Sequence, residues 1–388
     1  MKWLYLDHNA TTQPLPQVVE AMLPWLSTHY GNPSSSHPLG RQAREALVNA
    51  RASVAAFLQS NPAEVVFTSG ATESNHLAIL AALAARPERR QIVTSAVEHT
   101  STRLLLAQLA KQGVEVVEIG VDAQGQLSMP ELLAAVGPHT ALVSLMHANH
   151  ETGVIFPVAE AAEIAHRHGA LMHVDAAQSA GKLPLNMAAL GCDLLGFSAH
   201  KLYAAKGTGV LYVKKGLSLQ PMLWGNQERH RRGGTENLPG IVGLATACDV
   251  LGGDLATHAS RMAALRDQFE QAVLQALPAV EVNGGGPRVA NTSHLCFAGL
   301  SADSSTDLNG EALLLRLEKQ GVLASRGSAC SAGGNQPSHV LLAMGRSEQQ
   351  ALCSLRFSLG IHHTAADMQQ LLAAVVTSVR QLQLQQAA

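Results

Sequence analysis

The sequence predicts an α/β protein with a large domain built on a mainly parallel seven-stranded sheet, followed by a smaller α+β domain. Between about residues 62 and 215, seven short apolar runs rich in Val and Ile alternate with amphipathic segments of helix length. Such alternation is typical of parallel strands that helices cover on both faces. After about residue 255, a long helical stretch (258–277) leads into mixed strands and helices, which indicates a second domain.

The apolar runs have the length of buried strands, and the segments between them have the period of helices. The expected strands are EVVF (64–67), QIVTS (91–95), VEVVEI (114–119), ALVSLM (141–146), LMHVD (171–175), LLGFS (194–198) and GVLYV (209–213). Residues 73–85 and 158–169 predict two of the intervening helices. We therefore expect the large domain over residues 13–254. The small domain should comprise residues 255–388 together with residues 1–12, which are too few to fold alone.

Composition and charge limit the function classes. The chain has 388 residues, is 47% hydrophobic and carries a formal net charge of −2, with no basic stripe. Nucleic acid or an anionic membrane is therefore not expected as the main partner. The five cysteines are widely spaced without a C-x-x-C motif, which argues for a reducing compartment. The N-terminus lacks the apolar core of a secretory signal, and no apolar run has membrane-spanning length, so we expect a cytoplasmic protein.

Two strand ends carry polar residues suited to ligand binding. In TSGATESN (68–75) a strand ends, a Gly turn follows and a helix begins near Thr72. Backbone N–H groups at a helix N-terminus can bind phosphate, although a capping turn with Thr72 as N-cap explains the same residues. In HVDAAQ (173–178), Asp175 ends a buried strand, where open α/β sheets bind ligands. This carboxylate is either a cap or a partner for a cationic ring nitrogen.

A third strand end carries a lysine. In FSAHKLYAAKG (197–207), Ser198, His200 and Lys201 follow directly on an apolar run. Lysine amines form Schiff bases with carbonyl cofactors. Together with the phosphate-binding turn and the strand-end carboxylate, this lysine points to pyridoxal phosphate, which needs all three groups.

Two further residues have no evident structural purpose. Arg356 interrupts the apolar strand SLRFSLG (354–360), and a planar guanidinium binds a carboxylate such as that of an amino acid. Cys330 lies in SRGSACSAGG (325–334), a Gly/Ser/Ala segment without apolar periodicity. Such a segment is expected to be exposed, and an exposed thiol is reactive when its pKa is lowered. An incidental surface cysteine is the alternative.

With these motifs in this order, the sequence closely resembles the cysteine desulfurases of the NifS and IscS type. The resemblance covers nearly the whole chain and rests on YLDHNATT, GNPSSSH, FTSGATESN, VEH, HANHETG, HVDAAQSAGK, FSAHK, QERHRRGGTEN, GSACSAGG and LRFSLG. These are class-V, fold-type-I pyridoxal 5′-phosphate enzymes. The resemblance implies an aspartate-aminotransferase-like fold and a homodimer with active sites at the subunit interface.

The resemblance also implies the roles of the cofactor residues. Lys201 holds the cofactor covalently, Asp175 pairs with its ring nitrogen, and Gln178 bonds its phenolic oxygen. His99, in VEH, stacks on the ring and moves protons. The phosphate is bound by Ala71 through its backbone, Thr72, Ser198, His200 and, from the partner subunit, Thr235.

The implied reaction converts L-cysteine to L-alanine. Arg356 binds the substrate carboxylate, Lys201 moves the Cα proton, and Cys330 attacks the substrate sulfur to form a persulfide. The sulfur then passes to an acceptor protein, either an iron–sulfur scaffold or another sulfur carrier, and Cys330 is a possible transient iron–sulfur ligand. No resident metal is expected. A selenocysteine lyase or a related β-eliminating enzyme is the alternative within the enzyme class, and a non-catalytic, desulfurase-like binding protein is the alternative outside it.

Some positions depart from the family pattern. His150 replaces the usual Asn in N-N-E-T-G, and we expect it as an altered cofactor contact that can titrate near neutral pH. Trp224-Gly225-Asn226 replaces a Gly-Gly-Gly near the expected site entrance. Arg326 replaces a small polar residue, and its charge is expected to lower the pKa of the Cys330 thiol. We expect the extended C-terminal tail of IscS-type members to be short or absent.

Overall fold

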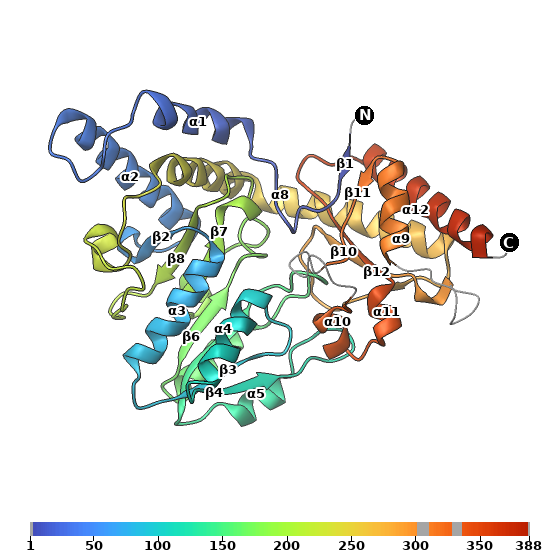
Figure 1. The fold of residues 1–388 in the computed structure, drawn as a ribbon, viewed down its shortest axis with the longest axis horizontal. Helices are drawn as coiled ribbons and strands as arrows, with labels where there is room; N and C mark the ends of the chain where they lie inside the picture. The colour runs from blue at the N-terminus through green and yellow to red at the C-terminus, as the bar shows by residue number, and fades with distance from the viewer. Residues whose placement is uncertain (1–2, 301–309, 328–335, 387–388) are drawn as a thin grey trace.

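The seven-stranded sheet forms the centre of the larger part of the molecule in the computed structural model, which describes residues 3–300, 310–327 and 336–386 (Figure 1). Its strand order is β2-β8-β7-β6-β5-β3-β4. β8 runs antiparallel to β2 and β7, and the other neighbours are parallel. The strands are β2 (Val65–Thr68), β3 (Gln91–Ser95), β4 (Glu115–Ile119), β5 (Thr140–Met146), β6 (Leu171–Asp175), β7 (Leu194–Ser198) and β8 (Gly209–Val213).

Both faces of this sheet are buried, which explains why its central strands are continuously apolar. Alternate side chains of a strand point to opposite faces. Accordingly Val66 packs with residues of α3 and α4, whereas Val65 and Phe67 pack with residues of α2 and α6. The first-domain helices are α1 (Pro16–Ser27), α2 (Pro38–Phe57), α3 (Ala71–Ala85), α4 (Thr100–Ala110), α5 (Met129–Ala135), α6 (Val158–Arg167) and α7 (Met187–Leu190). The fold class predicted from the sequence is therefore confirmed.

A long helix links this part to a second hydrophobic core. α8 (Leu238–Ala276) loses helical geometry at Asp254, and its C-terminal half packs in the second core. This core also contains the three-stranded antiparallel sheet β12-β10-β9 and the flanking helices. The elements are β9 (Glu281–Val282), β10 (Thr292–Cys296), β12 (Ser354–Ser358), α9 (Gly310–Lys319) and α12 (Ala365–Gln386).

α8 passes a length and composition test for a membrane-crossing helix, although no such run was expected from the sequence. Half of its most apolar stretch is buried inside the fold, as is common for a core helix. α8 packs along α1, α2 and α12. Its apolar composition is therefore accounted for by helix packing within the fold.

The N-terminal segment crosses from the second core to the first. Strand β1 (Leu4–Tyr5) pairs in parallel with β11 (Val322–Leu323), and Leu6 is buried in the second core. A few residues later, the Thr12 N–H donates to the His200 carbonyl of the first part. The segment therefore lies between the two cores, close to the carboxyl ends of the parallel strands.

Short elements complete the described chain. Helices α10 (His339–Ala343) and α11 (Glu348–Leu352) lie in sequence between β11 and β12 of the second core, yet Val340 and Ala351 pack against the first core. Four 3₁₀ turns are η1 (Pro62–Glu64), η2 (Ala199–Lys201), η3 (Gln227–His230) and η4 (Ala298–Leu300).

Candidate active site

A cavity of about 230 Å³ lies at the carboxyl ends of β5, β6 and β7, beside the N-terminus of α3. This is where open α/β sheets bind ligands. Its lining brings together most of the residues that the sequence singled out: Ala71, Thr72, His99, His150, Asp175, Gln178, Ser198, His200 and Lys201, with Ala10, Asn75, Ser101, Met146, Ala148 and Ala177.

The first turn of α3 is available to an anion. Gly70 is the N-cap and supplies no side-chain cap, so the expected alternative of Thr72 as N-cap is wrong. The Ala71 N–H donates to Ser198 Oγ at 2.9 Å, which joins this turn to the end of β7. Burial lowers the pKa of His200 to about 4, so its imidazole is neutral and can donate or accept a hydrogen bond. A helix N-terminus surrounded by hydroxyls suits a phosphate group.

Asp175 ends β6 as a buried carboxylate. It accepts hydrogen bonds from Asn75 Nδ2 at 2.6 Å and from the Ala177 N–H at 2.9 Å. Burial raises its pKa, while these donors and the nearby His99 and Lys201 oppose the rise. Within the described part of the chain, no cationic side chain forms an ion pair with it. The cavity therefore presents a carboxylate that a cationic ligand would complement.

Lys201 reaches the cavity from η2 and contacts the N-terminal segment. Its Nζ donates to the carbonyls of Asn9 and Ala10, the latter at 2.9 Å. Gln178 Nε2 donates to the same Asn9 carbonyl at 2.9 Å. The buried Lys182 Nζ donates to Gln178 Oε1 at 2.6 Å and to Asn9 Oδ1 at 2.9 Å. Because the Gln178 amide oxygen accepts from Lys182, the Gln178 amide nitrogen is the group that donates to Asn9.

Two imidazoles face one another at the cavity wall. His99 is the N-cap of α4, and its Nδ1 accepts from the Ser101 N–H at 3.2 Å, so a neutral His99 carries its proton on Nε2. The ring of His150 lies edge-on, with centroids 5.5 Å apart. Burial, followed by His99 and other cations, lowers the pKa of His150 well below its ordinary value. Burial therefore favours the neutral imidazole of His150, in the direction opposite to the expected titration near neutral pH.

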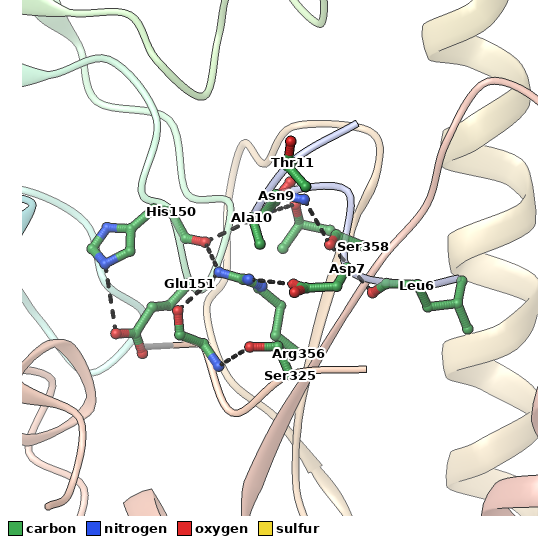
Figure 2. Close-up of polar contacts among 12 residues, drawn as sticks. Leu6, Asp7, Asn9, Ala10, Thr11, His150, Glu151, Ser325, Arg356 and Ser358 are labelled. Carbon is green, nitrogen blue, oxygen red and sulfur yellow. Dashed lines mark hydrogen bonds and ion pairs between the residues drawn. The ribbon is translucent and has the colours of Figure 1, made fainter. Parts of the chain in front are cut away.

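Arg356 comes from β12 of the second core and is held by three partners (Figure 2). Its Nη2 donates to Asp7 Oδ1 at 2.6 Å, and its Nη1 donates to the carbonyls of His150 and Gly327 at 2.7 and 3.0 Å. Arg356 and Lys201 both line an adjoining cavity of about 100 Å³. A guanidinium and an amine from separate cores thus face the same small space.

Among the predicted site residues that the structure describes, Thr235 lines neither cavity. Thr235 is exposed, so a role for it requires another subunit. Cys330 lies outside the described residues. Gly327, directly before that gap, and Ser338, shortly after it, both lie against Glu151. Ser338 Oγ donates to Glu151 Oε2 at 2.6 Å, and a Cβ added to Gly327 would lie 3.0 Å from the same oxygen.

Sequence reasoning missed several polar residues of the site. Asn9 accepts from Lys182 and Lys201, Asn75 donates to Asp175, and Asp7 pairs with Arg356. Asn75 was detectable, because it lies in the first turn of a helix already expected to bind phosphate. The others gave no local signal, because their partners are distant in sequence.

Comparison with known proteins agrees with this geometry. A family model described as aminotransferase class-V matches residues 4–371. The chain is 44% identical over 384 residues to a cysteine desulfurase of Trichormus azollae, covering 98% of this chain and 94% of the relative. It is 45% identical over 364 residues to a cysteine desulfurase of Klebsiella pneumoniae, covering 92% and 88%. A solved NifS-like protein superimposes with a TM-score of 0.89 at 32% identity, covering 97% and 99%. The NifS-like protein of Rickettsia africae gives 0.85 at 28% identity, with the same coverage.

The buried Glu151 predicts a pH dependence of stability. Burial raises the pKa of Glu151 to about 7, against the hydrogen bond from Ser338. The folded chain therefore keeps a proton that the unfolded chain loses. The contribution of this protonated carboxyl to folding stability is full below the ordinary glutamate pKa and is lost as pH rises through about 7. We predict that Glu151→Gln is more stable than wild type at pH 8, by a few kcal/mol at most, and that the difference vanishes near pH 4.5.

Denaturant unfolding of both proteins across this pH range measures the effect. The exposed Glu115→Gln is the matched control and should follow the wild-type profile. A Glu151→Gln profile parallel to wild type would show that this carboxyl is ionised in the fold.

Proposed function

The chain belongs to the class-V aminotransferase family and to its cysteine desulfurases, and on that premise we propose that it uses pyridoxal 5′-phosphate to take sulfur from L-cysteine. The products are L-alanine and a persulfide on Cys330. One observation carries this proposal most directly: the Lys201 amine and the Arg356 guanidinium open into one space beside a helix N-terminus and a buried carboxylate. In this space a substrate carboxylate can bind Arg356, a phosphate can bind at the N-terminus of α3, and the substrate amino group can lie beside Lys201.

The residues present fit the cofactor. Asp175 is a buried acceptor without a cationic partner among the described residues, as a ring nitrogen requires. The first turn of α3, with no side-chain cap, offers donors for a phosphate. When bound, the cofactor supplies an electron sink that lets a proton leave the substrate Cα. The residues that would hold it are Ala71, Thr72, His99, Asp175, Gln178, Ser198, His200 and Lys201, with His150 as a further contact from the cavity wall.

The chain's own groups orient the substrate and move its protons. Arg356 binds the cysteine carboxylate, and the Asp7 carboxylate holds the guanidinium in place. Lys201 takes the Cα proton, because its amine is the basic group at the covalent attachment site. His99, with its Nε2 proton directed away from the Ser101 contact, moves a second proton.

Cys330 is the nucleophile toward sulfur. Its thiolate attacks the substrate Sγ, a new S–S bond forms, and the Cβ–Sγ bond breaks with its electron pair staying on carbon. Protonation of that carbon completes L-alanine. The selenocysteine lyase alternative uses the same residues, and no contact in the described chain favours it.

The persulfide is passed to an acceptor protein, either an iron–sulfur scaffold or another sulfur carrier, in the cytoplasm. The support is the family alone: curated desulfurases match this chain over nearly its full length. The low content of charged residues and the absence of a basic stripe agree with a protein acceptor and with neither nucleic acid nor membrane as partner.

We also propose a homodimer in which Thr235 completes the partner's phosphate site. Thr235 is exposed and outside the cavity of its own chain. The turn before it is fixed: Glu228 is buried, has a left-handed backbone, and forms a two-pronged ion pair with Arg51 at 2.6 and 2.7 Å. Large apolar side chains such as Leu26 and Trp224 are exposed in the neighbouring segments, as at an uncovered subunit contact.

The catalytic claim predicts separate losses in two variants. Incubated with L-cysteine and a reductant, the wild-type holoenzyme should release alanine and sulfide in equal amounts. Cys330→Ala should keep the cofactor's visible absorption but release almost no sulfide, because the sulfur acceptor is missing. Lys201→Ala should lose the absorption band of covalently held cofactor.

Buried Cys248, outside the site, supplies the matched control: Cys248→Ala should retain activity. Full sulfide release by Cys330→Ala would show that sulfur leaves without a persulfide on this residue.

The dimer claim predicts complementation between two defective chains. Lys201→Ala dimers should be inactive, and Thr235→Ala dimers should bind the cofactor weakly. A mixed dimer contains one site with native Lys201 from one chain and native Thr235 from the other. Sulfide release at limiting cofactor should therefore exceed the sum for the two separate variants. If the mixture gives no more than that sum, Thr235 does not act across the interface.

A further inference from the structure

Four buried polar side chains form a continuous hydrogen-bonded chain behind the cavity. Ser144 Oγ lies 2.9 Å from His173 Nδ1, and His173 Nε2 lies 3.2 Å from Asn75 Oδ1. Asn75 Nδ2 then donates to Asp175 Oδ2 at 2.6 Å. All four residues are buried, and only Asn75 and Asp175 reach the cavity lining. These hydrogen bonds therefore connect Ser144 on β5 to the Asp175 carboxylate at the cavity.

Strand geometry brings these residues together. His173 and Asp175 are two residues apart on β6 and point to the same face. Ser144 on β5 is the register partner of His173, and Asn75 projects from the first turns of α3. On β7 the register partner of Asp175 is Gly196, where an added Cβ would lie 2.3 Å from Asn75 Oδ1. This glycine leaves the space that the Asn75 amide occupies.

The hydrogen bonds can run in only one direction while Asp175 is ionised. A carboxylate only accepts, so the Asn75 nitrogen must face it and the Asn75 oxygen must face His173. His173 must then donate from Nε2, which leaves its Nδ1 to accept from the Ser144 hydroxyl. Reversing the chain would require a protonated Asp175, and the Ala177 N–H at its other oxygen favours the ionised form.

We propose that Asn75 and His173 are positioning residues that keep Asp175 ionised and directed at a cationic aromatic nitrogen in the cavity. This inference rests on the proposed function, since pyridoxal phosphate supplies that nitrogen. The interaction is charge-assisted at the carboxylate, and its geometry is set before the ligand arrives. The ring nitrogen consequently keeps its proton over the whole working pH range.

The groups around the Asp175 carboxylate support the direction of donation from Ser144 through His173 and Asn75 to an ionised Asp175. Burial lowers the pKa of His173 to about 3, so the imidazole stays neutral and its donor role is fixed. His99 from α4 and Lys201 from η2 face Asp175 and favour its charge. Glu98 faces it from the end of β3, and burial raises the pKa of Glu98 to about 8, so below that pH this neighbour adds little opposing charge.

Nitrogen NMR of holoenzyme loaded with ring-¹⁵N pyridoxal phosphate tests the proposal. In wild type the ring nitrogen should stay protonated from pH 6 to 9. His173→Phe removes the donor to Asn75, so the ring-nitrogen pKa should fall by about one unit or more. His173→Gln keeps a donor at a similar position and should restore the wild-type spectrum. His76→Gln, at a neighbouring histidine of α3 outside the chain of four, should leave it unchanged.

A second variant perturbs the Asn75 amide from β7 and keeps the proposal testable if His173→Phe does not fold. Gly196→Ala should displace the Asn75 amide and lower the ring-nitrogen pKa in the same direction, whereas Gly137→Ala, where an added Cβ meets nothing within 4 Å, should not. A ring nitrogen that titrates identically in wild type, His173→Phe and Gly196→Ala overturns the proposal.

The cofactor-free protein separates this inference from the proposed function. Imidazole ¹⁵N spectra should show His173 as a neutral Nε2–H tautomer that does not titrate between pH 5.5 and 8.5. A His173 that titrates in this range, or that carries its proton on Nδ1, contradicts the chain of donors whether or not pyridoxal phosphate binds. Failure of the protein to bind pyridoxal phosphate contradicts the proposed function and leaves this spectrum as the deciding result.

Discussion

The site depends on the N-terminal segment that lies between the two cores. Asp7 pairs with Arg356 of the second core (Figure 2). Two residues later, the Asn9 carbonyl accepts from Lys201 of the first core. Strand β1 fixes the start of this segment, and the Thr12 hydrogen bond fixes its end. Asp7, Asn9 and Ala10 thus set the separation between the Lys201 amine and the Arg356 guanidinium, which face the proposed substrate site.

This arrangement concentrates positive charge in a buried space. Lys201 and Arg356 face it, and Lys182 lies behind its wall, where it donates to Asn9 and Gln178. Burial, followed by Lys201 and Arg356, lowers the pKa of Lys182 well below its ordinary value. Asp7 compensates the charge of Arg356, whereas Asp175 lines the neighbouring cavity and accepts from Asn75 and from the Ala177 N–H. Because two cationic side chains lie close together in a buried setting, an anionic group beside them is favoured. A substrate carboxylate meets that preference at Arg356, which supports the proposed amino-acid substrate.

The fold was predictable from the sequence because its signals are local. Four of the seven strands have the bounds expected from their apolar runs; β4 and β5 differ by one residue at one end, and β2 is shifted by one residue at both ends. The full length of α8 was not foreseen, since its first half is rich in Gly and Ala and the helix bends at Asp254. Lys201 and Asp175 were found because strand ends mark ligand sites in such sheets. Asn9 and Lys182 were not, because hydrogen bonds between residues this far apart exist only after folding.

The central claim is that an amino-acid substrate lies across the two cores, with its carboxylate at Arg356 and its amino group beside Lys201, where the cofactor is proposed to be held. The most direct measurement is the dissociation constant of holoenzyme for the product L-alanine and for ethylamine, which lacks the carboxylate, in wild type and Arg356→Gln. The account predicts that wild type prefers L-alanine strongly and that Arg356→Gln loses at least about tenfold of that preference, because a charge-assisted hydrogen bond is removed. The same preference in both proteins would contradict it.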